Sequence, residues 1–327
     1  MQKELKAKRL GLLAVFSAIL LVIMIGSVLI LDKHIYPDIP ESIHERKTLM
    51  YNGVSYFPRQ DIRVYLLMGI DRKGNVEDSN AYRNPGAADV VLVVVFDETA
   101  NEYSVLALNR DTMVEMPVLG LGGKNAGSIN AQLALSHTYG NGLHQSCENV
   151  KETVSELLYG IPIHQYFSMN MDVISILTDA VGGVKVNVTE DFSAVDCTIQ
   201  PGEVTLNGEQ AYLFVRTRKD VGDQLNLSRM DRHKEFMFGF VEALHENIGH
   251  DSSKVMEIYE KISPYMVTDC SDHMMTDLFN RFIEYELKDV VSPVGTNVRG
   301  EEYMEFYLDE EKLLELAIFL FYEPKNN

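Results

Sequence analysis

Two charged residues, Arg110 and Asp111, closely follow an apolar segment that is typical of a buried β-strand. The segment "YSVLAL" covers residues 103–108, and only Asn109 separates it from the arginine. The planar guanidinium of arginine suits phosphate in particular. The change from apolar to charged residues therefore indicates that a site begins where this strand ends.

Two aspartates are expected at the same edge of the predicted sheet. Asp71 follows a strand predicted over 62–70, and Asp89 precedes a strand predicted over 90–96. The short turn "DETANE" joins this second strand to the one that ends before Arg110, so the two form an antiparallel hairpin. If the first strand is the antiparallel neighbour of the second, all of these charged residues meet at one edge.

This convergence makes Asp71 and Asp89 candidate ligands of a metal ion. Two carboxylates held close together repel each other unless a cation lies between them. A hard divalent cation such as Mg²⁺ binds one or two carboxylates together with phosphate oxygens. The alternative is that each aspartate caps a turn or a helix.

A second cluster of cations lies within the segment "FVRTRKDVGDQLNLSRMDRHKEF". The predicted strand at its start places Arg216 and Arg218 on one face. Ser228 is expected to cap a helix through about residue 248, and cations in the first turns of a helix are favourable when an anion is bound there. The candidates for binding a phosphate or pyrophosphate are Arg216, Arg218, Arg229, Arg232 and His233. The alternative is surface ion pairing with Asp220, Asp223 and Asp231.

Composition and missing motifs exclude several classes of protein. The formal net charge of −19 argues against a nucleic-acid partner. The sequence has no G-x-x-x-x-G-K-[ST], no G-x-S-x-G and no H-E-x-x-H motif. The three cysteines, Cys147, Cys197 and Cys270, fit no metal site by their spacing, and either one disulfide or none is expected.

The N-terminal region predicts a single-pass membrane anchor. Residues 11–31 carry no charge and are long enough to span a bilayer as a helix. The basic residues of the preceding tail, 1–10, predict a cytoplasmic N-terminus and an extracellular remainder. A cleaved signal peptide is the alternative. We expect a proline-containing stalk over 32–60 and one extracellular domain over 61–327, with a helical part from about residue 240.

The remaining pattern interleaves strands and helices. Helices are predicted over 130–139, 147–158, 252–262 and 273–287, with a further helix that ends at Gly182 and another at the C-terminus. Further strands are predicted over 163–168, 184–188 and 303–307. The expected fold is α/β, an α/β/α sandwich with a central mixed β-sheet.

The same residues carry a family resemblance. The chain resembles the LytR–CpsA–Psr family of membrane-anchored cell-wall enzymes in segments that run in order from about residue 62 to 235. These segments are "LLMGIDRKG", "GAADVVLVVVFD", "LALNRDTM", "SINAQLALSHTYG", "LLYGIPIHQYFSMNMDVISILTDAVGGVKVNV", "LNGEQAYLFVRTR" and "GDQLNLSRMDRHK". The resemblance implies transfer of a glycopolymer, such as teichoic acid or capsule, from a polyprenyl-pyrophosphate carrier to peptidoglycan.

The resemblance also implies roles for particular residues. Asp71 and Asp89 would bind Mg²⁺, and Asp111 would act as a base or would orient the neighbouring arginine. The pyrophosphate would be held by Arg110, Arg216, Arg218 and Arg229. The sequence departs from the family pattern at Ala87, Ser128 and His233, where the family often has arginine, lysine and glutamine.

Two other functions are compatible with the same residues. One is a non-catalytic module that binds or regulates through polyprenyl pyrophosphate or wall polymers. The other is a pyrophosphate hydrolase, which would use water in place of the sugar hydroxyl.

Overall fold

The computed structural model describes residues 48–120, 123–217, 221, 226–247, 252–271, 274, 284–301 and 303–325. The expected cytoplasmic tail (1–10) and transmembrane anchor (11–31) lie outside these residues. Among the described helices, none has the length and apolar character needed to cross a bilayer.

A six-stranded mixed sheet forms the centre of the molecule, in the order β11-β8-β3-β4-β5-β12. Its strands are β3 (Ile62–Ile70), β4 (Ala88–Asp97), β5 (Glu102–Leu108), β8 (Gln165–Asn170), β11 (Met266–Thr268) and β12 (Glu286–Val291). β4 is antiparallel to both β3 and β5, as predicted. β8 is antiparallel to β11, whereas β8 is parallel to β3 and β12 is parallel to β5. The predicted mixed sheet is therefore confirmed.

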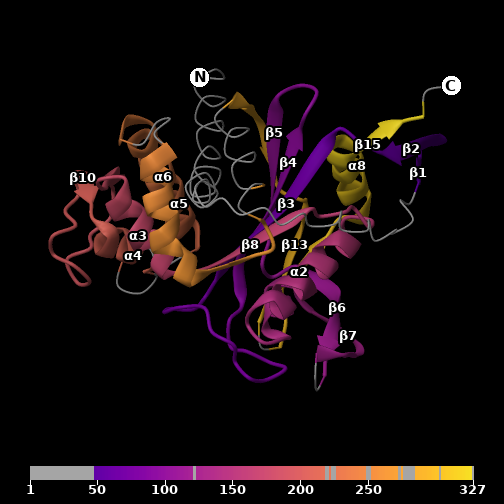
Figure 1. Cartoon of the computed structure of the whole chain (residues 1–327), viewed down its shortest axis with the longest axis horizontal. Coiled ribbons are helices and arrows are strands. Elements are labelled where there is room, and N and C mark those ends of the chain that lie inside the picture. Colours follow the sequence, from indigo (N-terminus) through magenta and orange to yellow (C-terminus); the bar gives the residue numbers. More distant parts are fainter. Residues whose placement is uncertain are drawn as a thin grey trace, which may run out of the picture.

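Helices cover both faces of this sheet (Figure 1). The helices on one face are α3 (Asp172–Ala180), α4 (Gly208–Arg216), α5 (Asn226–Asn247) and α6 (Ser252–Ile262). Those on the other face are the 3₁₀ helix η2 (Leu133–Thr138), α2 (His144–Leu157) and α8 (Glu310–Phe321). β4 supplies both cores, because Leu92 and Val94 face the first group whereas Val91 and Val93 face the second. This alternation builds the three layers of the predicted α/β/α sandwich.

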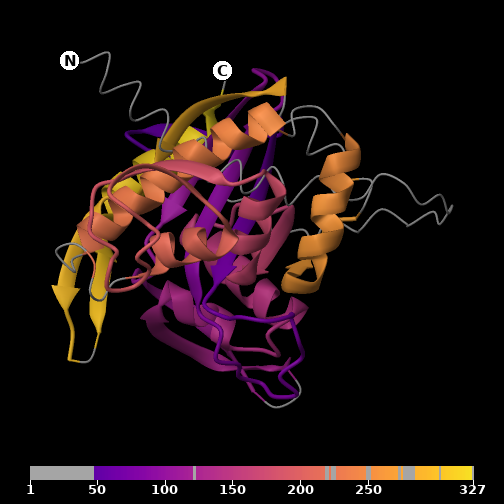
Figure 2. The same cartoon turned by 90° about the vertical axis from the view of Figure 1, so that its left-hand side faces the viewer.

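Short strands and one 3₁₀ helix lie outside the central sheet. Six of the strands form three pairs: β6 (Met113–Leu119) with β7 (Asn125–Gln132), β9 (Val184–Val188) with β10 (Gly202–Leu206), and β13 (Gly295–Arg299) with β14 (Met304–Leu308). The 3₁₀ helix η3 (Ser263–Tyr265) precedes β11. The β13–β14 hairpin projects from the body of the molecule (Figure 2).

Part of the expected stalk belongs to the folded domain. β1 (Leu49–Tyr51) and β2 (Val54–Pro58) form a hairpin, and β2 pairs with β15 (Tyr322–Pro324) near the C-terminus. The expectation of a stalk over 32–60 is therefore wrong for these strands. Their partner is more than 260 residues away, so local composition could not reveal the pairing.

Three predicted elements differ from the structure. The helix predicted over 130–139 is the end of β7 followed by η2, because this segment pairs with β6. The strand predicted to carry Arg216 is helix α4, which an Asn207–Gln210 capping box initiates. Of the range 273–287, predicted as a helix, the described residues Met274 and Glu284 are helical, and only the end differs, because β12 begins at Glu286.

Helix α5 approaches strand β9 closely at Gly239. A Cβ atom at this position would lie 1.8 Å from the carbonyl oxygen of Lys185. Only glycine avoids this clash, so the residue fixes how α5 packs beside β9. The helix begins at Asn226, two residues before the predicted cap at Ser228.

Candidate active site

Arg110 and Asp89 form an ion pair at one edge of the central sheet. Arg110 follows the end of β5, and its Nη1 donates to Oδ1 of Asp89 near the start of β4. Their side chains remain 33% and 25% exposed, so solvent and ligands reach the pair. The prediction that the hairpin places these residues together is confirmed.

An irregularity between β3 and β4 sets the position of Asp89. Gly69 is paired with Val90, but the next residue, Ile70, is paired with Ala88. The shift leaves Asp89 as an extra residue of β4, which is the arrangement of a β-bulge. Such bulges reorient a side chain and are frequent beside active sites.

The backbone around Arg110 is held in a tight turn. Thr112 donates its backbone N–H to the carbonyl oxygen of Asn109 at 3.0 Å, and the Asn109 side chain accepts from the N–H of Asp111 at 2.9 Å. The carbonyl oxygen of Arg110 accepts from Ala134 of η2 at 3.0 Å. These bonds fix the base of the arginine, so only its side chain must be ordered by a ligand.

Asp111 contacts both Arg110 and a residue that the sequence did not reveal. Its Oδ1 lies 3.4 Å from Nε of Arg110 and accepts from Nε2 of Gln132 at 3.0 Å. The same amide nitrogen donates to the carbonyl oxygen of Met304 at 2.7 Å. Gln132 therefore connects the site to the β13–β14 hairpin, and no local motif marks it for this role.

Arg216 reaches the site from the end of α4. Its Nη2 donates to Oδ1 of Asp71 at 3.3 Å, and its Nη1 donates to the hydroxyl of Tyr212 one helical turn earlier. The backbone N–H of Asp71 donates to the carbonyl oxygen of Ala87, which lies two residues before Asp89. The structure thus places Arg216 at the carboxylate edge, the end of the sheet that carries Asp71 and Asp89. Arg216 reaches it from a helix and not from the predicted strand.

Arg232 is buried and stabilises the fold. Its side chain is 4% exposed, and it donates to the carbonyl oxygens of Phe214 and Thr217 and to the carboxylate of Glu190. The two carbonyls flank Arg216 in sequence. We therefore correct its expected role: Arg232 holds the end of α4 that presents Arg216, and its donors are already used within the protein.

Three other predicted cations lie partly or wholly outside the described residues. Arg229 and His233 belong to helix α5, but their side chains lie outside the described part of the chain, as does the whole of Arg218. Two of the residues that depart from the family pattern make local hydrogen bonds. The carbonyl oxygen of Ala87 accepts from the backbone N–H of Asp71, and the hydroxyl of Ser128 donates to the carboxylate of Glu115 on β6 at 2.5 Å.

Asp71 and Asp89 fit the donors that Mg²⁺ prefers. Both carboxylates are partly exposed, and each forms an ion pair with an arginine. If a carboxylate bound the metal ion, its arginine could pair with a phosphate group. Among the described residues, no group of three or more histidine, cysteine or acidic side chains forms a metal cluster. A two-carboxylate site would therefore need phosphate or water oxygens to complete its coordination.

The cysteines form no disulfide. Cys147 is buried in the core, Cys197 is exposed and Cys270 is intermediate. Burial raises the pKa of the Cys147 thiol to about 12, so the residue packs as an apolar group.

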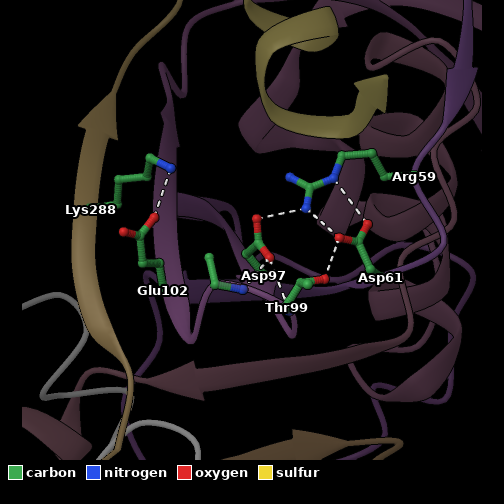
Figure 3. A network of polar contacts seen from close by, with 7 residues as sticks. Arg59, Asp61, Asp97, Thr99, Glu102 and Lys288 are labelled. Atoms are coloured by element: carbon green, nitrogen blue, oxygen red, sulfur yellow. Dashed lines mark hydrogen bonds and ion pairs between the residues drawn. The ribbon is translucent and has the colours of Figure 1, made fainter. Parts of the chain in front are cut away.

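The opposite end of the same strands carries a second charged network (Figure 3). Arg59 donates to Asp61 through two nitrogens, at 3.0 and 2.7 Å, and to Asp97 at 2.6 Å. Thr99 adds a hydrogen bond to Asp61 at 2.7 Å. The bonds from Arg59 lower the pKa of Asp61 to about 2. The hydrogen bonds among these residues connect the segment after β2 to the turn after β4. This end of the sheet therefore has a structural role.

The model of the LytR_cpsA_psr family matches residues 41–316, well over half of the sequence. The chain belongs to this family. The match includes every candidate residue at the carboxylate edge and confirms the resemblance seen in the motifs.

Two curated relatives of this LytR_cpsA_psr protein are named polyisoprenyl-teichoic acid–peptidoglycan teichoic acid transferase TagU. The one from Oceanobacillus iheyensis is 28% identical over 228 residues, which cover 68% of this chain and 64% of the relative. The one from Enterococcus faecalis is 30% identical over 217 residues, which cover 65% of this chain and 60% of the relative. The match therefore spans a little less than two thirds of each relative.

Solved structures share the fold. The crystal structure of B. subtilis TagV is 23% identical and has a TM-score of 0.60, with 80% of this chain and 96% of that chain covered. A Streptococcus agalactiae protein is 22% identical and has a TM-score of 0.62, with 80% and 86% covered. These similarities establish the common architecture of the mixed sheet and its helical layers.

Proposed function

We propose that this protein transfers a glycopolymer from a polyprenyl-pyrophosphate carrier to peptidoglycan. The observation that carries the proposal is the meeting of Arg110, Arg216, Asp71 and Asp89 at one exposed edge of the sheet. The names of the TagU relatives support teichoic acid as the polymer class. The proposed partners are therefore the lipid-linked glycan and the peptidoglycan acceptor.

The proposed reaction is a phosphoryl transfer. A hydroxyl oxygen of the acceptor attacks the sugar-proximal phosphorus, and a new phosphorus–oxygen bond forms. The bond from this phosphorus to the bridging oxygen breaks, and polyprenyl phosphate leaves with that oxygen. The hydroxyl proton passes to solvent. Catalysis of such a step comes mainly from positioning and from neutralising charge on the phosphoryl oxygens.

Arg110 and Arg216 are proposed to bind the pyrophosphate. In the free protein their guanidinium groups are paired with Asp89 and Asp71, and a phosphate oxygen can replace a carboxylate oxygen as acceptor. By family resemblance, Arg218 and Arg229 would add further donors. His233, where the family often has glutamine, is proposed as a donor only from its place near the start of α5. Asp111 is proposed to orient Arg110, because one of its carboxylate oxygens contacts both Arg110 and Gln132.

Mg²⁺ is the proposed cofactor, with Asp71 and Asp89 as its protein ligands. When bound, it would neutralise charge on the phosphate oxygens. The two arginines would then be released from their carboxylate partners and would be available to the substrate.

The prenyl chain is proposed to lie on the side of the sheet that carries α3, α4 and α5. These helices share one apolar core, whereas η2 belongs to the core on the opposite face. Because η2 lies on the opposite face, segment 130–139 is not proposed to contact the prenyl chain.

The apolar segment 11–31 is proposed to anchor the protein in the cell membrane. Its basic flank, with Lys3, Lys6, Lys8 and Arg9, would keep the N-terminus cytoplasmic and place the catalytic domain outside. Such an anchor would hold the domain beside the carrier lipid.

A reconstituted transfer assay tests the function. The full chain in detergent micelles is mixed with a short lipid-linked glycan and peptidoglycan oligomers, with and without Mg²⁺. Metal-dependent linkage of glycan to peptidoglycan, lost in Arg110→Ala, is the expected result. Release of glycan without linkage would identify a hydrolase, and binding without any product would identify a non-catalytic module.

A further inference from the structure

We propose that Lys73 is an additional pyrophosphate-binding residue and that Tyr212 positions both Lys73 and Arg216. This inference rests on the proposed function and extends its site along the sheet edge. It assigns two residues that the sequence motifs did not single out.

Tyr212 lies between the two cations. The Nζ atom of Lys73 lies 3.9 Å from the centroid of the Tyr212 ring, within the range of a cation–π contact. The hydroxyl of the same tyrosine accepts a hydrogen bond from Nη1 of Arg216. The ring therefore orders one cation over its face, while its hydroxyl orders the other.

The loop that carries Lys73 is anchored on both sides of this residue. The carbonyl oxygen of Arg72 accepts from the N–H of Met171 at 2.8 Å. Gly74 donates its N–H to Asp172 at 2.7 Å, and its carbonyl oxygen accepts from the side chain of Asn170 at 2.7 Å. The loop is thus fixed to the junction between β8 and α3, and the lysine side chain extends from a defined backbone.

The cations follow the order of the strands. Arg110 comes after β5, Arg216 contacts Asp71 after β3, and Lys73 lies on the loop joined to the end of β8. A pyrophosphate carries two linked phosphate groups, so a row of cations suits it better than a single point of charge.

Electrostatics also favour an anion at this position. Lys73 and Arg216 carry like charges that share one tyrosine, and this arrangement is unfavourable unless negative charge compensates it. Asp71 pairs with Arg216. Within the described part of the chain, Lys73 makes no ion pair with a carboxylate. A phosphate bound beside Arg216 would supply the missing counter-charge.

Calorimetric titration of the full chain in detergent with inorganic pyrophosphate tests the inference. Lys73→Met should weaken binding roughly three- to tenfold, as expected for loss of one charge-assisted contact at an exposed site. Lys325→Met is the matched control, because Lys325 also lies over an aromatic ring, that of Phe57 in β2, but directly follows β15. The control should bind like the wild type.

Two substitutions of Tyr212 separate its ring from its hydroxyl. Tyr212→Phe keeps the face for Lys73 but removes the acceptor for Arg216, whereas Tyr212→Leu removes both. Adding Lys73→Met should therefore weaken binding further in the Phe background and much less in the Leu background. Thermal unfolding of each variant verifies that it is folded.

The outcomes distinguish this inference from the proposed function. If the wild type binds pyrophosphate and Arg110→Ala does not, but Lys73→Met binds normally, then only the role of Lys73 is overturned. Equal effects of Lys73→Met in both Tyr212 backgrounds would overturn the positioning role of Tyr212. If the wild type does not bind pyrophosphate at all, both the inference and the proposed site are wrong.

Discussion

Arg110 at the end of β5 forms an ion pair with Asp89 in the bulge of β4. The pair balances charge at the site before any substrate is present. Each partner also has a proposed use in the reaction, the arginine for phosphate and the aspartate for Mg²⁺. Binding of substrate and metal would exchange this internal pair for two external ones, which would couple the two binding events.

Arg110→Ala should lower glycopolymer transfer by about 10²- to 10³-fold, the effect of removing one donor that stabilises developing charge. The measurement is the rate of linkage to peptidoglycan oligomers. Arg63→Ala is the matched control, since Arg63 lies near the opposite end of β3 and is paired with Glu98. A normal rate in Arg110→Ala would remove this arginine from the site.

Asp71→Asn and Asp89→Asn should each raise the Mg²⁺ concentration needed for half-maximal transfer by roughly tenfold or more, because a hard cation loses a charged ligand. A metal titration of the reaction rate gives this concentration directly. Asp61→Asn, at the far end of the sheet, should leave it unchanged. Unaltered metal dependence in both site variants would contradict the assignment.

Asp111→Asn should retain transfer within about tenfold of the wild type, because the amide oxygen still accepts from Gln132 and approaches Arg110. Loss of a general base would instead cost about 10²- to 10⁴-fold. Single-turnover rates across a range of pH separate these cases. A large loss with normal pyrophosphate binding would identify Asp111 as the base.

Arg232→Met should destabilise the fold by about 3–5 kcal/mol, because it leaves the carboxylate of Glu190 without its buried partner and removes the donors to the carbonyl oxygens of Phe214 and Thr217. Denaturant unfolding measures the change. A double variant that adds Glu190→Leu should recover part of the loss. If Arg232→Met leaves stability unchanged and abolishes pyrophosphate binding, then the guanidinium contacts substrate after all.

The Arg59 network should give an acid-dependent contribution to stability. The pKa of Asp61 is about 2 when folded, below its usual value of 3.8, so its contribution is present above pH 4 and is lost as pH falls from about 4 to 2. More than a third of the Asp61 side chain is exposed, so screening limits the effect to about 1 kcal/mol or less. Unfolding of wild type and Asp61→Asn at pH 7 and pH 3 tests this. A difference between the two proteins that is larger at pH 3 would contradict it.

Much of the carboxylate edge followed from local sequence. The apolar runs of β3, β4 and β5 and the short turn between the last two left few ways to pair them, so Asp71, Asp89 and Arg110 had to meet. The charge pattern of segment 216–233 identified its arginines as candidate phosphate ligands, although the secondary structure was assigned wrongly at α4. The signal for that helix was present in Asn207 and Gln210, whose spacing forms a capping box.

Other parts of the site depend on contacts between distant segments. Gln132 joins Asp111 to Met304, which lies 172 residues further along the chain. Tyr212 contacts Lys73 of a segment far from it in the sequence, and Arg232 is buried, which its charge alone would not suggest. No periodicity or spacing reports such neighbours, because they arise only when helices pack onto the sheet.

The sequence by itself determined the strands, the hairpin and the charged residues that end them, since these rest on short-range pairing and on alternation of apolar side chains. The tertiary structure decided which cations reach the carboxylates and which are consumed in holding the fold. The physical reason is that an arginine has the same charge everywhere, but its use depends on burial and on the acceptors around it. Arg216 and Arg232, 16 residues apart, show the two outcomes.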